Sequence, residues 1–575
     1  MPRRVREIER PQIAHRKIRV RPQDIQEAKK IAAASGLNVV ASKVLAARGF
    51  KADKTLQNFI KPSLQSGLPS PEGIKNIAEA CALVDDICKE NGAIAICCDF
   101  DVDGLSGGAQ MHHFFRSIGA VSKVFVPDRF EDGYGLNSNM VREIAKQGFA
   151  LLLTIDYGTT NGKELELARS LGLKSIVIDH HHVSAPPPAD VFINPNQEGC
   201  GFADRVLCAS GLAWYFIAAL RKCLKRAAKV DAKQYLDLAC LGTICDMVPL
   251  SGANRIIAKR GLEMLSRSSR AGIVALRNVM GAHRELTCTD VSFGIGPRLN
   301  AAGRMVHAEV VIDLLTTEDS DRARRVAQQL NKLNAERQDT ENSVKEQAVS
   351  LIMAQKSLNA GLVVAKADFH TGVVGIVAQR LVEHFYRPAV VLGMDSAGIF
   401  KGSVRGIKGF SVVEALASVG EHLEKFGGHE GAGGLSVKEE KLEDFSAAFI
   451  DECKRRLSGV ELDPYVEADT EVELNEIEIP LVEQLKRFAP FGMGNPSPVL
   501  LVRDLKVLDV KVLKGAHLKA MLSDGQRFIS GLMWRQSSHP ALNAGSKVNV
   551  ALRPDTNNFN GITELQGNIQ AVEPA

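Results

Sequence analysis

At 575 residues the chain is too long for one hydrophobic core, so about three to four domains are expected. Hydrophobic residues make up 45% and charged residues 24%, and the net charge is only +4, which is ordinary for a soluble globular protein and does not by itself indicate a nucleic-acid binder. Eleven cysteines without a CxxC pair argue against a zinc or disulfide scaffold, and the absence of an apolar run of about 18 residues argues against a membrane span, so we expect a cytoplasmic protein.

The beginning of the chain carries a concentration of positive charge. Among the first 22 residues eight are Arg or Lys, and only Glu7 and Glu9 are acidic. Such an arm either contacts a phosphate backbone or is a solvated terminal tail, and the sequence leaves both open. We place it in an N-terminal basic and helical segment over residues 1–75.

The next region, residues 76–318, has the pattern of an α/β domain. Residues 93–98, 151–155 and 175–178 are apolar runs without polar alternation, as expected for strands buried on both faces. Segments with helical character lie between these runs. The alternation predicts an open, mostly parallel sheet covered by helices.

A long charged segment at residues 319–355 contains no Pro and no Gly, which predicts one connecting helix. Strand-like runs resume at 361–365 and 388–392, so a second α/β lobe is predicted over residues 356–460.

From residue 461 to residue 575 the pattern changes again. Short strands such as 499–502 and 505–512 alternate with turns rich in Gly, Asn and Pro, which predicts a small β-barrel. The predicted fold is therefore α/β, with two α/β lobes joined by a long helix and a C-terminal barrel of the OB type.

Acidic and histidine residues gather directly after the predicted buried strands. Asp99, Asp101 and Asp103 follow the first strand, Asp156 follows the second, and Asp179, His180 and His181 follow the third. Ligands of an open α/β sheet bind at the carboxyl ends of its strands, so these side chains are predicted to converge in one crevice. Asp246, in an apolar context further on, is a fourth acidic candidate because a buried carboxylate usually has a partner.

Converging carboxylates repel one another unless cations neutralise them. Oxygen ligands with an imidazole suit Mn²⁺ or Mg²⁺. Two such ions roughly 3.5–4 Å apart stabilise the attacking and the leaving oxygen of an in-line phosphoryl displacement. For one Asp alone, a helix cap or a turn is the alternative, but three such motifs in succession favour a two-metal phosphodiesterase.

These motifs resemble, in order, those of the DHH phosphoesterase superfamily: DFDVDG at 99–104, DYG at 156–158, DHH at 179–181, and a later aspartate. The resemblance implies that the metal ligands are Asp101, Asp103, Asp156, His180 and Asp246, with Asp99 close to them. It also implies that His181 faces the scissile phosphate or its leaving group and that Asp179 orients the histidines.

The sequence GGHEGAGG at 427–434 is a second distinctive block. Its glycines let a backbone approach a ligand closely and expose N–H groups to an anion. It resembles the GGHxxAGG loop of the DHHA1 domain, which accompanies DHH domains and grips the nucleotide, and this implies substrate contacts at Gly428, His429 and Gly431. Ser403 and Arg405 either contact phosphate or form a structural ion pair and turn.

Two further segments resemble the RecJ family of nucleases in particular. PRLNAAGRM at 297–305 is similar to its PRxNAAGR element, in which Arg298, Asn300 and Arg304 either bind phosphates or tie the lobes together. PFGMGNP at 490–496 is similar to the segment that approaches the OB-fold of that family. Arg129 is a further candidate phosphate contact.

The RecJ resemblance implies a 5′→3′ exonuclease that uses two Mn²⁺ or Mg²⁺ ions to release 5′-mononucleotides from single-stranded DNA, in DNA repair and recombination. An OB-fold would extend the track for a single strand. Single-stranded DNA is the expected partner of a monomer without membrane association, and a single-strand-binding protein and a helicase are candidate protein partners.

Two other functions stay open at this point. A DHH phosphodiesterase that acts on short oligonucleotides or cyclic dinucleotides shares the metal motifs, although most such enzymes lack the PRxNAAGR element and a C-terminal barrel. A relative that binds single strands without cleaving them keeps the fold, although the intact acidic and histidine positions argue against it.

Overall fold

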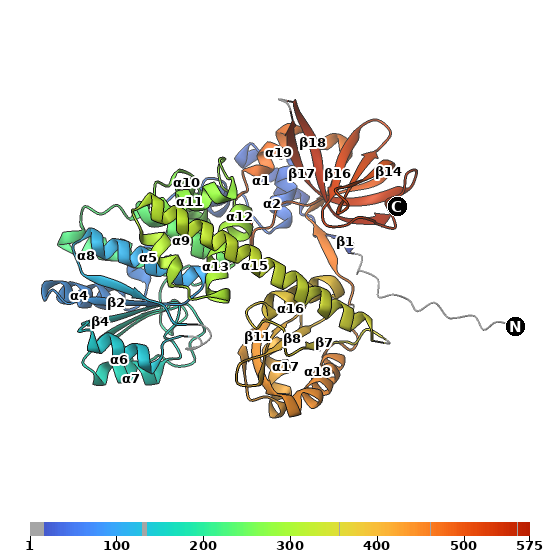
Figure 1. Ribbon diagram of the computed structural model, residues 1–575. Helices are drawn as coiled ribbons and strands as arrows, with labels where there is room; N and C mark the ends of the chain where they lie inside the picture. Colours follow the sequence, from blue (N-terminus) through green and yellow to red (C-terminus); the bar gives the residue numbers. More distant parts are fainter. Residues whose placement is uncertain (1–15, 129–134, 356, 461, 560–561) are drawn as a thin grey trace. The chain divides into compact units, whose positions relative to one another are not determined.

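The structure is a computed structural model that describes residues 16–128, 135–355, 357–460, 462–559 and 562–575. The chain divides into two compact units, which we name by their sheets (Figure 1). The parallel-sheet unit comprises Lys51–Ala335 and Lys486–Ser497, and the barrel unit comprises the residues up to Phe50, Glu336–Leu485 and Pro498–Ala575. Among the described residues, no helix combines the length and the apolar character that crossing a membrane requires.

The parallel-sheet unit is built on five strands in the order β3-β2-β4-β5-β6, and all neighbours are parallel. Residues of β2 and β4 are buried along their whole length because helices cover both faces, which explains their continuous apolar character. The chain leaves β2 toward β3 on one side and returns to β4 on the other, so the topological switch point lies between β2 and β4. The strands are β2 (Ile94–Cys98), β3 (Ser122–Phe125), β4 (Leu151–Ile155), β5 (Lys174–Ile178) and β6 (Val191–Ile193).

Helices pack on both faces of this sheet. One face and its helices, α4, α5, α8 and those after them, form a large apolar core, and α6 and α7 cover the other face (Figure 1). The helices are α3 (Lys54–Ile60), α4 (Ile77–Lys89), α5 (Val102–Ser117), α6 (Ser138–Lys146), α7 (Gly162–Ser170), α8 (Ala209–Cys223), α9 (Leu236–Cys245), α10 (Gly252–Arg267), α11 (Ala271–Met280), α12 (Cys288–Asp290), α13 (Gly296–Met305) and α14 (Glu309–Thr316). Short helical turns lie at Pro71–Gly73, Lys225–Ala227, Ala232–Tyr235 and Val291–Ile295.

The predicted connecting helix is a single helix of 34 residues, α15 (Ser320–Met353). Its first part buries Ala327 and Leu330 in the core of the parallel-sheet unit, and its second part buries Val344 and Ala348 in a core of the barrel unit. Apolar residues at helical spacing therefore anchor each end, while the rest of the helix carries charged and polar side chains.

The second α/β lobe lies in the barrel unit. Its sheet has the order β10-β11-β9-β8-β7, with β7 and β8 parallel and the other neighbours antiparallel. The elements are β7 (Leu362–Ala365), α16 (Val374–Phe385), β8 (Ala389–Met394), β9 (Ile399–Arg405), α17 (Val412–Ser418), β10 (Lys425–Gly428), β11 (Ala432–Lys438) and α18 (Leu442–Arg456), with short turns at Gly420–His422 and Glu439–Lys441.

The C-terminal strands form a closed barrel, because β14 pairs with β15 on one side and with β17 on the other. The segments 499–502 and 505–512, expected as separate strands, belong to one 14-residue strand with a register shift between Val502 and Leu505, where Asp504 has φ 56°. The strands are β13 (Thr470–Glu471), β14 (Leu500–Leu513), β15 (His517–Ser523), β16 (Phe528–Met533), β17 (Lys547–Phe559) and β18 (Ile562–Pro574). Leu474–Glu476 and α19 (Ile479–Lys486) precede β14. The predicted fold class, with two α/β lobes, a long helix and an OB-like barrel, is confirmed.

The described part of the N-terminal segment is shared between the two units. β1 (Lys17–Val20) pairs in parallel with β12 (Tyr465–Ala468), and α1 (Ile25–Ser35) and α2 (Val39–Ala47) belong to the barrel unit, whereas α3 belongs to the parallel-sheet unit. The domain boundaries drawn from the sequence stay a prediction.

The segment 486–497 also packs away from its neighbours in sequence. The buried Arg255 of α10 donates from Nε to the carbonyl of Phe59 and from Nη2 to the carbonyl of Ala489, each at 3.0 Å. Leu250 N donates to the carbonyl of Met493 at 2.8 Å. These bonds fix the PFGMGNP segment within the parallel-sheet unit.

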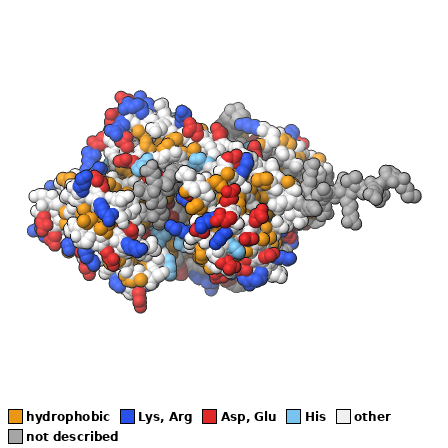
Figure 2. Space-filling model, turned by 60° about the horizontal axis from the view of Figure 1, so that its bottom comes forward, with side chains coloured by type: hydrophobic (Ala, Val, Ile, Leu, Met, Phe, Trp, Pro, Cys, Tyr) orange, Lys and Arg blue, Asp and Glu red, His pale blue; other side chains and the backbone are white. Residues whose placement is uncertain are grey.

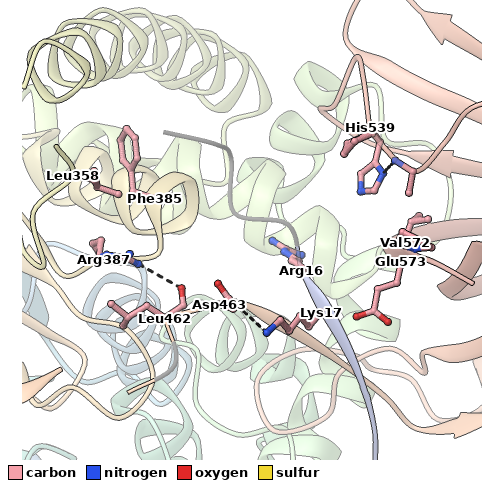
Figure 3. Close-up of a pocket in the computed structure, with 13 residues that line it drawn as sticks. Arg16, Lys17, Leu358, Phe385, Arg387, Leu462, Asp463, His539, Val572 and Glu573 are labelled. Carbon is pink, nitrogen blue, oxygen red and sulfur yellow. Dashed lines mark hydrogen bonds and ion pairs between the residues drawn. The ribbon is translucent and has the colours of Figure 1, made fainter. Parts of the chain in front are cut away.

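Among the described residues, the surface charge and the cavity add little evidence about where a functional site lies. Figure 2 shows Lys and Arg side chains interspersed with Asp and Glu on the face it presents, in keeping with the small net charge. A cavity of about 560 Å³ lies in the barrel unit, and its Lys17 and Asp463 pair with each other at 2.9 Å (Figure 3). Of the predicted site residues that the structure describes, none lines this cavity.

A buried ion pair next to the barrel offers a test of its packing. Both oxygens of Asp469 accept from Arg48 at 2.8 Å, and Oδ2 also accepts from Val499 N at 2.9 Å. Both side chains are less than a tenth exposed. Asp469→Ala leaves the Arg48 charge buried without its carboxylate, so we expect a loss of about 3–5 kcal/mol in the free energy of unfolding, measured with urea.

The matched control is Glu471→Ala, which removes an ion pair with Arg503 of 2.7 Å whose side chains are about half exposed. This change is expected to cost less than about 1 kcal/mol because water screens the pair. Equal losses for the two variants would contradict the structural role of Asp469.

Candidate metal centre

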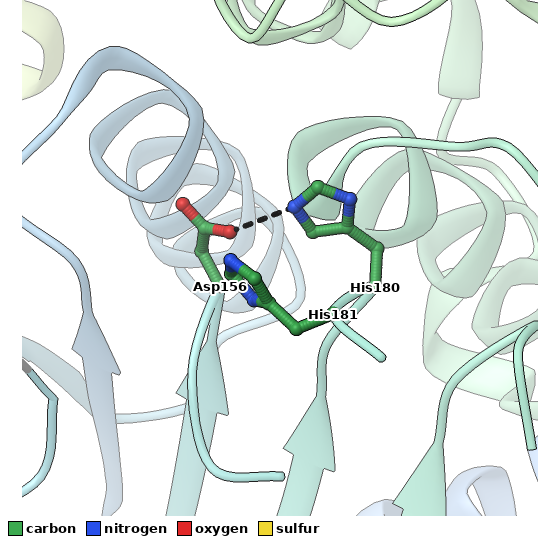
Figure 4. A group of neighbouring side chains, drawn as sticks. All are labelled: Asp156, His180 and His181. Atoms are coloured by element: carbon green, nitrogen blue, oxygen red, sulfur yellow. Dashed lines mark ion pairs between the residues drawn. The ribbon is translucent and has the colours of Figure 1, made fainter. Parts of the chain in front are cut away.

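The predicted catalytic residues lie together at the carboxyl edge of the parallel sheet. Nε2 of His180 is 3.2 Å from Oδ1 of Asp156, 3.8 Å from Oδ2 of Asp246 and 3.9 Å from Oδ2 of Asp103. Figure 4 shows Asp156 and His180, from the ends of neighbouring strands, pointing toward each other beside His181. One imidazole nitrogen thus lies among three carboxylates.

The remaining predicted residues belong to the same cluster. Within each of three overlapping groups, the candidate ligand atoms lie within 4.8 Å of one another. The groups are Asp156 with His180 and His181, Asp103 with His180 and Asp246, and Asp99 with Asp101 and Asp156. The structure therefore brings together all seven residues that the sequence predicts for catalysis, and their roles stay a proposal.

Asp101 is also the N-cap of α5. Its Oδ1 accepts from Asp103 N at 2.9 Å and from Gly104 N at 3.2 Å, so the helix-cap alternative holds for this residue in addition to its place in the cluster. A side chain at Gly104 would lie 2.6–2.8 Å from the backbone of Asp99, which explains the glycine. Asn300 of α13 accepts from Val102 N at 3.1 Å and fixes the same turn.

Asp103 is held by the N-terminus of another helix. Its Oδ2 accepts from Ala209 N at 2.7 Å and its Oδ1 from Ser210 N at 2.9 Å, at the positive end of α8. A side chain at Gly242 of α9 would collide with Asp103 and Ser210, so this glycine allows α9 to approach and to bring Asp246 to the cluster.

Asp156 adopts a left-handed backbone conformation, with φ 70°. Such a conformation is uncommon for a residue with a side chain, although Asp and Asn tolerate it better than most. Backbone strain of this kind is concentrated at functional sites. The turn after β4 therefore directs the Asp156 carboxylate toward His180 at a cost in local free energy.

Burial and mutual repulsion make these carboxylates hard to ionise. Burial, reinforced by the charge of Asp101, raises the pKa of Asp103 above its ordinary value. Burial and the neighbouring carboxylates raise the pKa of Asp156 and that of Asp246 in the same way. A divalent cation between them would remove the repulsion.

His181 and Asp179 form a separate pair. Nδ1 of His181 is 2.7 Å from Oδ1 of Asp179. Burial alone would lower the pKa of His181, but the hydrogen bond and the charge of Asp179 outweigh it and the net shift is upward. Burial opposes ionisation of Asp179 as well, yet its bonds with His181 and Thr159 hold its pKa far below the ordinary value. His182, beside them, is exposed.

Three residues of this region carry no signal in the sequence. Thr159 donates from Oγ1 to Oδ2 of Asp179 at 2.6 Å, Asn194 donates to the carbonyl of His181 at 2.9 Å, and Asn196 donates to the carbonyl of His180 at 2.6 Å. Thr and Asn in a loop are ordinary turn residues. Only the fold shows that they surround the DHH motif.

The predicted substrate residues of the parallel-sheet unit make internal contacts. Arg298 donates from Nε to Asn331 of α15 at 2.9 Å and from Nη1 to the carbonyl of Gly294 at 2.8 Å. These contacts and the bond of Asn300 to Val102 N all lie within the parallel-sheet unit, so phosphate binding or tying of the lobes by these residues stays a prediction. Arg304 lies on the same helix, α13, and is half-buried. Arg129 lies outside the described residues.

The other predicted substrate residues belong to the barrel unit. Arg405, at the end of β9, donates from Nη1 to Ser403 Oγ at 2.7 Å and to the carbonyl of Val404 at 2.9 Å. Gly428, His429 and Gly431 lie at the turn between β10 and β11, where His429 N donates to the carbonyl of Ala432 at 2.8 Å. The structure shows the internal hydrogen bond of Arg405, and phosphate contact at these positions stays a proposal.

The donor set fits hard divalent cations. The three groups together offer five carboxylates and the imidazoles of His180 and His181, and thiolate ligands are absent from them. This is the chemistry that Mn²⁺ and Mg²⁺ prefer.

Family models match three parts of the chain. The N-terminal domain of the DHH family matches residues 93–243, the DHHA1 domain matches 359–455, and the RecJ OB domain matches 468–571.

Curated relatives match most of its length. The single-stranded-DNA-specific exonuclease RecJ of Haemophilus influenzae is 32% identical over 91% of this chain and 93% of its own, and that of Escherichia coli is 31% identical over 92% and 95%. The RecJ of Bacillus subtilis is 33% identical over 91% of this chain, which spans 66% of that relative.

Solved structures match between about two thirds and nearly all of the chain. RecJ of Thermus thermophilus in complex with Mn²⁺ matches with a TM-score of 0.83 and 28% identity over 97% of this chain and 79% of that one. Its Mg²⁺ complex matches with a TM-score of 0.78 and 26% identity over 97% and 78%. An exonuclease RecJ bound to manganese matches with a TM-score of 0.59 and 32% identity over 69% of this chain and 99% of that one.

The raised pKa values predict how metal-free protein responds to pH. A carboxyl group whose pKa is higher in the folded state stabilises the fold fully below its unfolded pKa of about 3.9, and this contribution is lost as the pH rises through the folded value. With EDTA present, the Tm of the parallel-sheet unit should therefore fall more between pH 5 and pH 8 in the unchanged chain than in Asp246→Asn.

Mn²⁺ should abolish the larger fall in Tm that the unchanged chain shows between pH 5 and pH 8. At 100 times its Kd, one bound ion adds about 2.7 kcal/mol to the free energy of unfolding. Saturating Mn²⁺ is expected to raise the Tm of the unchanged chain at pH 8 and to raise that of Asp246→Asn less. The same increase in both proteins would argue against cation binding at the cluster.

Proposed function

Because the chain belongs to the RecJ family of single-stranded-DNA-specific exonucleases, we propose that its carboxylate cluster hydrolyses the terminal phosphodiester bond of single-stranded DNA and releases 5′-mononucleotides in the 5′→3′ direction. The observation that carries this proposal is the convergence of Asp103, Asp156 and Asp246 on Nε2 of His180 at the switch point of the parallel sheet.

The cofactors are divalent cations, Mn²⁺ or Mg²⁺. Asp101, Asp103, Asp156, His180 and Asp246 would hold two of them, with Asp99 beside the cluster. When bound, the ions neutralise charge on the phosphate and make a water nucleophilic near neutral pH. The protein itself orients the carboxylates, through the N-termini of α5 and α8.

His181 would act on the scissile phosphate or on its leaving group. Because Nδ1 is held by Asp179, Nε2 is the ring nitrogen that would face the phosphate or the leaving oxygen. At that position the imidazole would act as the acid that donates a proton to the leaving group.

Single-stranded DNA is favoured over a small phosphodiester by the barrel. The RecJ OB domain matches 468–571, and OB-folds bind single strands through stacking and backbone contacts. Phe528, the first residue of β16, and Trp534, in the turn that follows β16, are 73% and 55% exposed, so their rings can stack on bases. A DHH enzyme for dinucleotides has no need of this surface.

The cellular process and the protein partners are inferred from the substrate. Single strands arise in DNA repair and recombination, where a helicase exposes them and a single-strand-binding protein covers them, so these are the protein partners to test, with the chain acting as a monomer. All eleven cysteines fall within the described residues and are free thiols, which supports the reducing cytoplasm.

The test uses long oligonucleotides labelled at either end, single- or double-stranded, with Mn²⁺, with Mg²⁺ or with EDTA. The expected result is release of 5′-mononucleotides from the 5′ end of the single strand only, with a divalent ion present. Binding of the single strand without cleavage would overturn the exonuclease proposal, and faster turnover of a dinucleotide than of the long strand would favour the small-substrate alternative.

Substitution of the cluster should abolish cleavage. We expect Asp156→Asn and His180→Ala each to lower kcat by more than the roughly 10–100-fold that outer partners of a metal site cost. Asparagine keeps the tolerance for the left-handed backbone at position 156, so the fold should survive, as circular dichroism would show. Near-normal activity of either variant would contradict the assignment of that residue as a metal ligand.

The barrel aromatics should affect binding rather than chemistry. Phe528→Ala with Trp534→Ala is expected to weaken binding of a long single strand by about 1–3 kcal/mol per lost stacking contact and to leave kcat at saturating DNA unchanged. The control is Leu508→Ala with Val512→Ala, two exposed aliphatic side chains of β14. Equal affinity of both double variants would exclude stacking at this face.

A further inference from the structure

The two histidines of the DHH motif have every backbone polar group bonded to a side chain. His180 N and His181 N both donate to Oδ1 of Asp179, at 2.7 and 3.2 Å. The carbonyl of His180 accepts from Asn196 Nδ2 at 2.6 Å, and the carbonyl of His181 accepts from Asn194 Nδ2 at 2.9 Å. Asparagines after β6 thus hold one side of the loop, and Asp179 holds the other.

Thr159 completes this arrangement from the loop after β4. Its N and Oγ1 both donate to Oδ2 of Asp179, at 3.0 and 2.6 Å. Thr159 and Asp179 are both buried. Thr159 follows Asp156 by three residues, so its hydroxyl links the loop of one predicted metal ligand to the loop of the next, His180.

The asparagine turn is itself rigid. Asn194 is fully buried, and its Oδ1 accepts from Asn196 N at 2.8 Å. Its Nδ2 also lies 3.5 Å from Thr159 Oγ1. A buried polar network in which each group is bonded has one favoured arrangement, because any other leaves a desolvated group without a partner.

We propose that Thr159, Asn194 and Asn196 are positioning residues of the active site. They hold the DHH loop so that Nε2 of His180 stays against Asp156 and Nδ1 of His181 stays against Asp179. None of the three is a predicted metal ligand, and each would act through its hydrogen bond to Asp179 or to a histidine carbonyl. The inference rests on the proposed function for its effect on cleavage, but not for its effect on metal binding.

The first experiment compares Thr159→Val, which keeps the shape and removes the hydroxyl, with Thr159→Ser, which keeps the hydroxyl. Ser175→Ala is the matched control. It removes a buried hydroxyl that donates to Asp190 at 3.0 Å. Ser175 lies near the beginning of β5, whereas Asp179, the partner of Thr159, follows the end of that strand. Loss of stability alone should be similar for Thr159→Val and Ser175→Ala, and is measured by the Tm.

Outer partners of metal sites typically contribute 10–100-fold to metal affinity or activity. We therefore expect Thr159→Val to lower kcat on single-stranded DNA by roughly 10–100-fold with little change in KM, and to weaken binding of Mn²⁺ alone in calorimetry. Thr159→Ser should restore most of both, and Ser175→Ala should change neither.

Asn196 provides a second variant on the exposed side of the loop. Asn196→Asp is isosteric but cannot donate to the carbonyl of His180, so it should lower kcat while the Tm stays near that of the unchanged chain.

The outcomes separate the two claims. If the unchanged chain binds Mn²⁺ but cleaves no DNA, the proposed function fails, and weaker Mn²⁺ binding by Thr159→Val still supports positioning. The positioning inference is overturned if Thr159→Val matches the unchanged chain in kcat and Mn²⁺ affinity. It is also overturned if Thr159→Val, Thr159→Ser and Ser175→Ala lose activity in parallel with their Tm.

Discussion

The metal centre and the helices around it depend on one interaction, the repulsion among buried carboxylates that lie close together. Asp103 and Asp156 are nearly inaccessible to solvent and lie near further acids, so each raises the free energy of ionising the others. The fold offsets part of this cost by directing the N-terminus of α8 at Asp103. Protonation relieves the rest in metal-free protein, and bound cations would relieve it near neutral pH; such cations are also what phosphodiester hydrolysis requires. The carboxylate cluster therefore destabilises the metal-free fold when it is ionised, and it would serve phosphodiester hydrolysis once cations are bound.

The architecture explains how such a cluster can form at all. The ligands come from the ends of β2, β4, β5 and α9, which are distant in sequence and meet only because a parallel sheet brings its carboxyl ends to one edge. Small residues permit the approach: Gly104 lies against Asp99, and Gly242 lets α9 reach Asp103. Packing thus limits which residues the positions around the cluster accept, beyond the ligands themselves.

The sequence allowed most of the cluster to be predicted, because buried strands have a clear apolar pattern and each was followed by acidic residues. It did not reveal Thr159 or Asn194, whose residue types are common in turns and gain a role only through contacts across the sheet edge. It also did not reveal that Asn300 accepts from Val102 N at the turn that carries Asp101. The barrel could be predicted from its alternation, but the bulge at Asp504 that keeps β14 continuous could not.

The most direct test of the central claim is the anomalous scattering of crystals grown with Mn²⁺. Metal-dependent catalysis at the carboxylate cluster predicts two Mn²⁺ peaks with ligands drawn from Asp101, Asp103, Asp156, His180 and Asp246. Both peaks should be lost or weakened in Asp156→Asn. Peaks elsewhere in the chain, with none among these side chains at saturating Mn²⁺, would contradict the account.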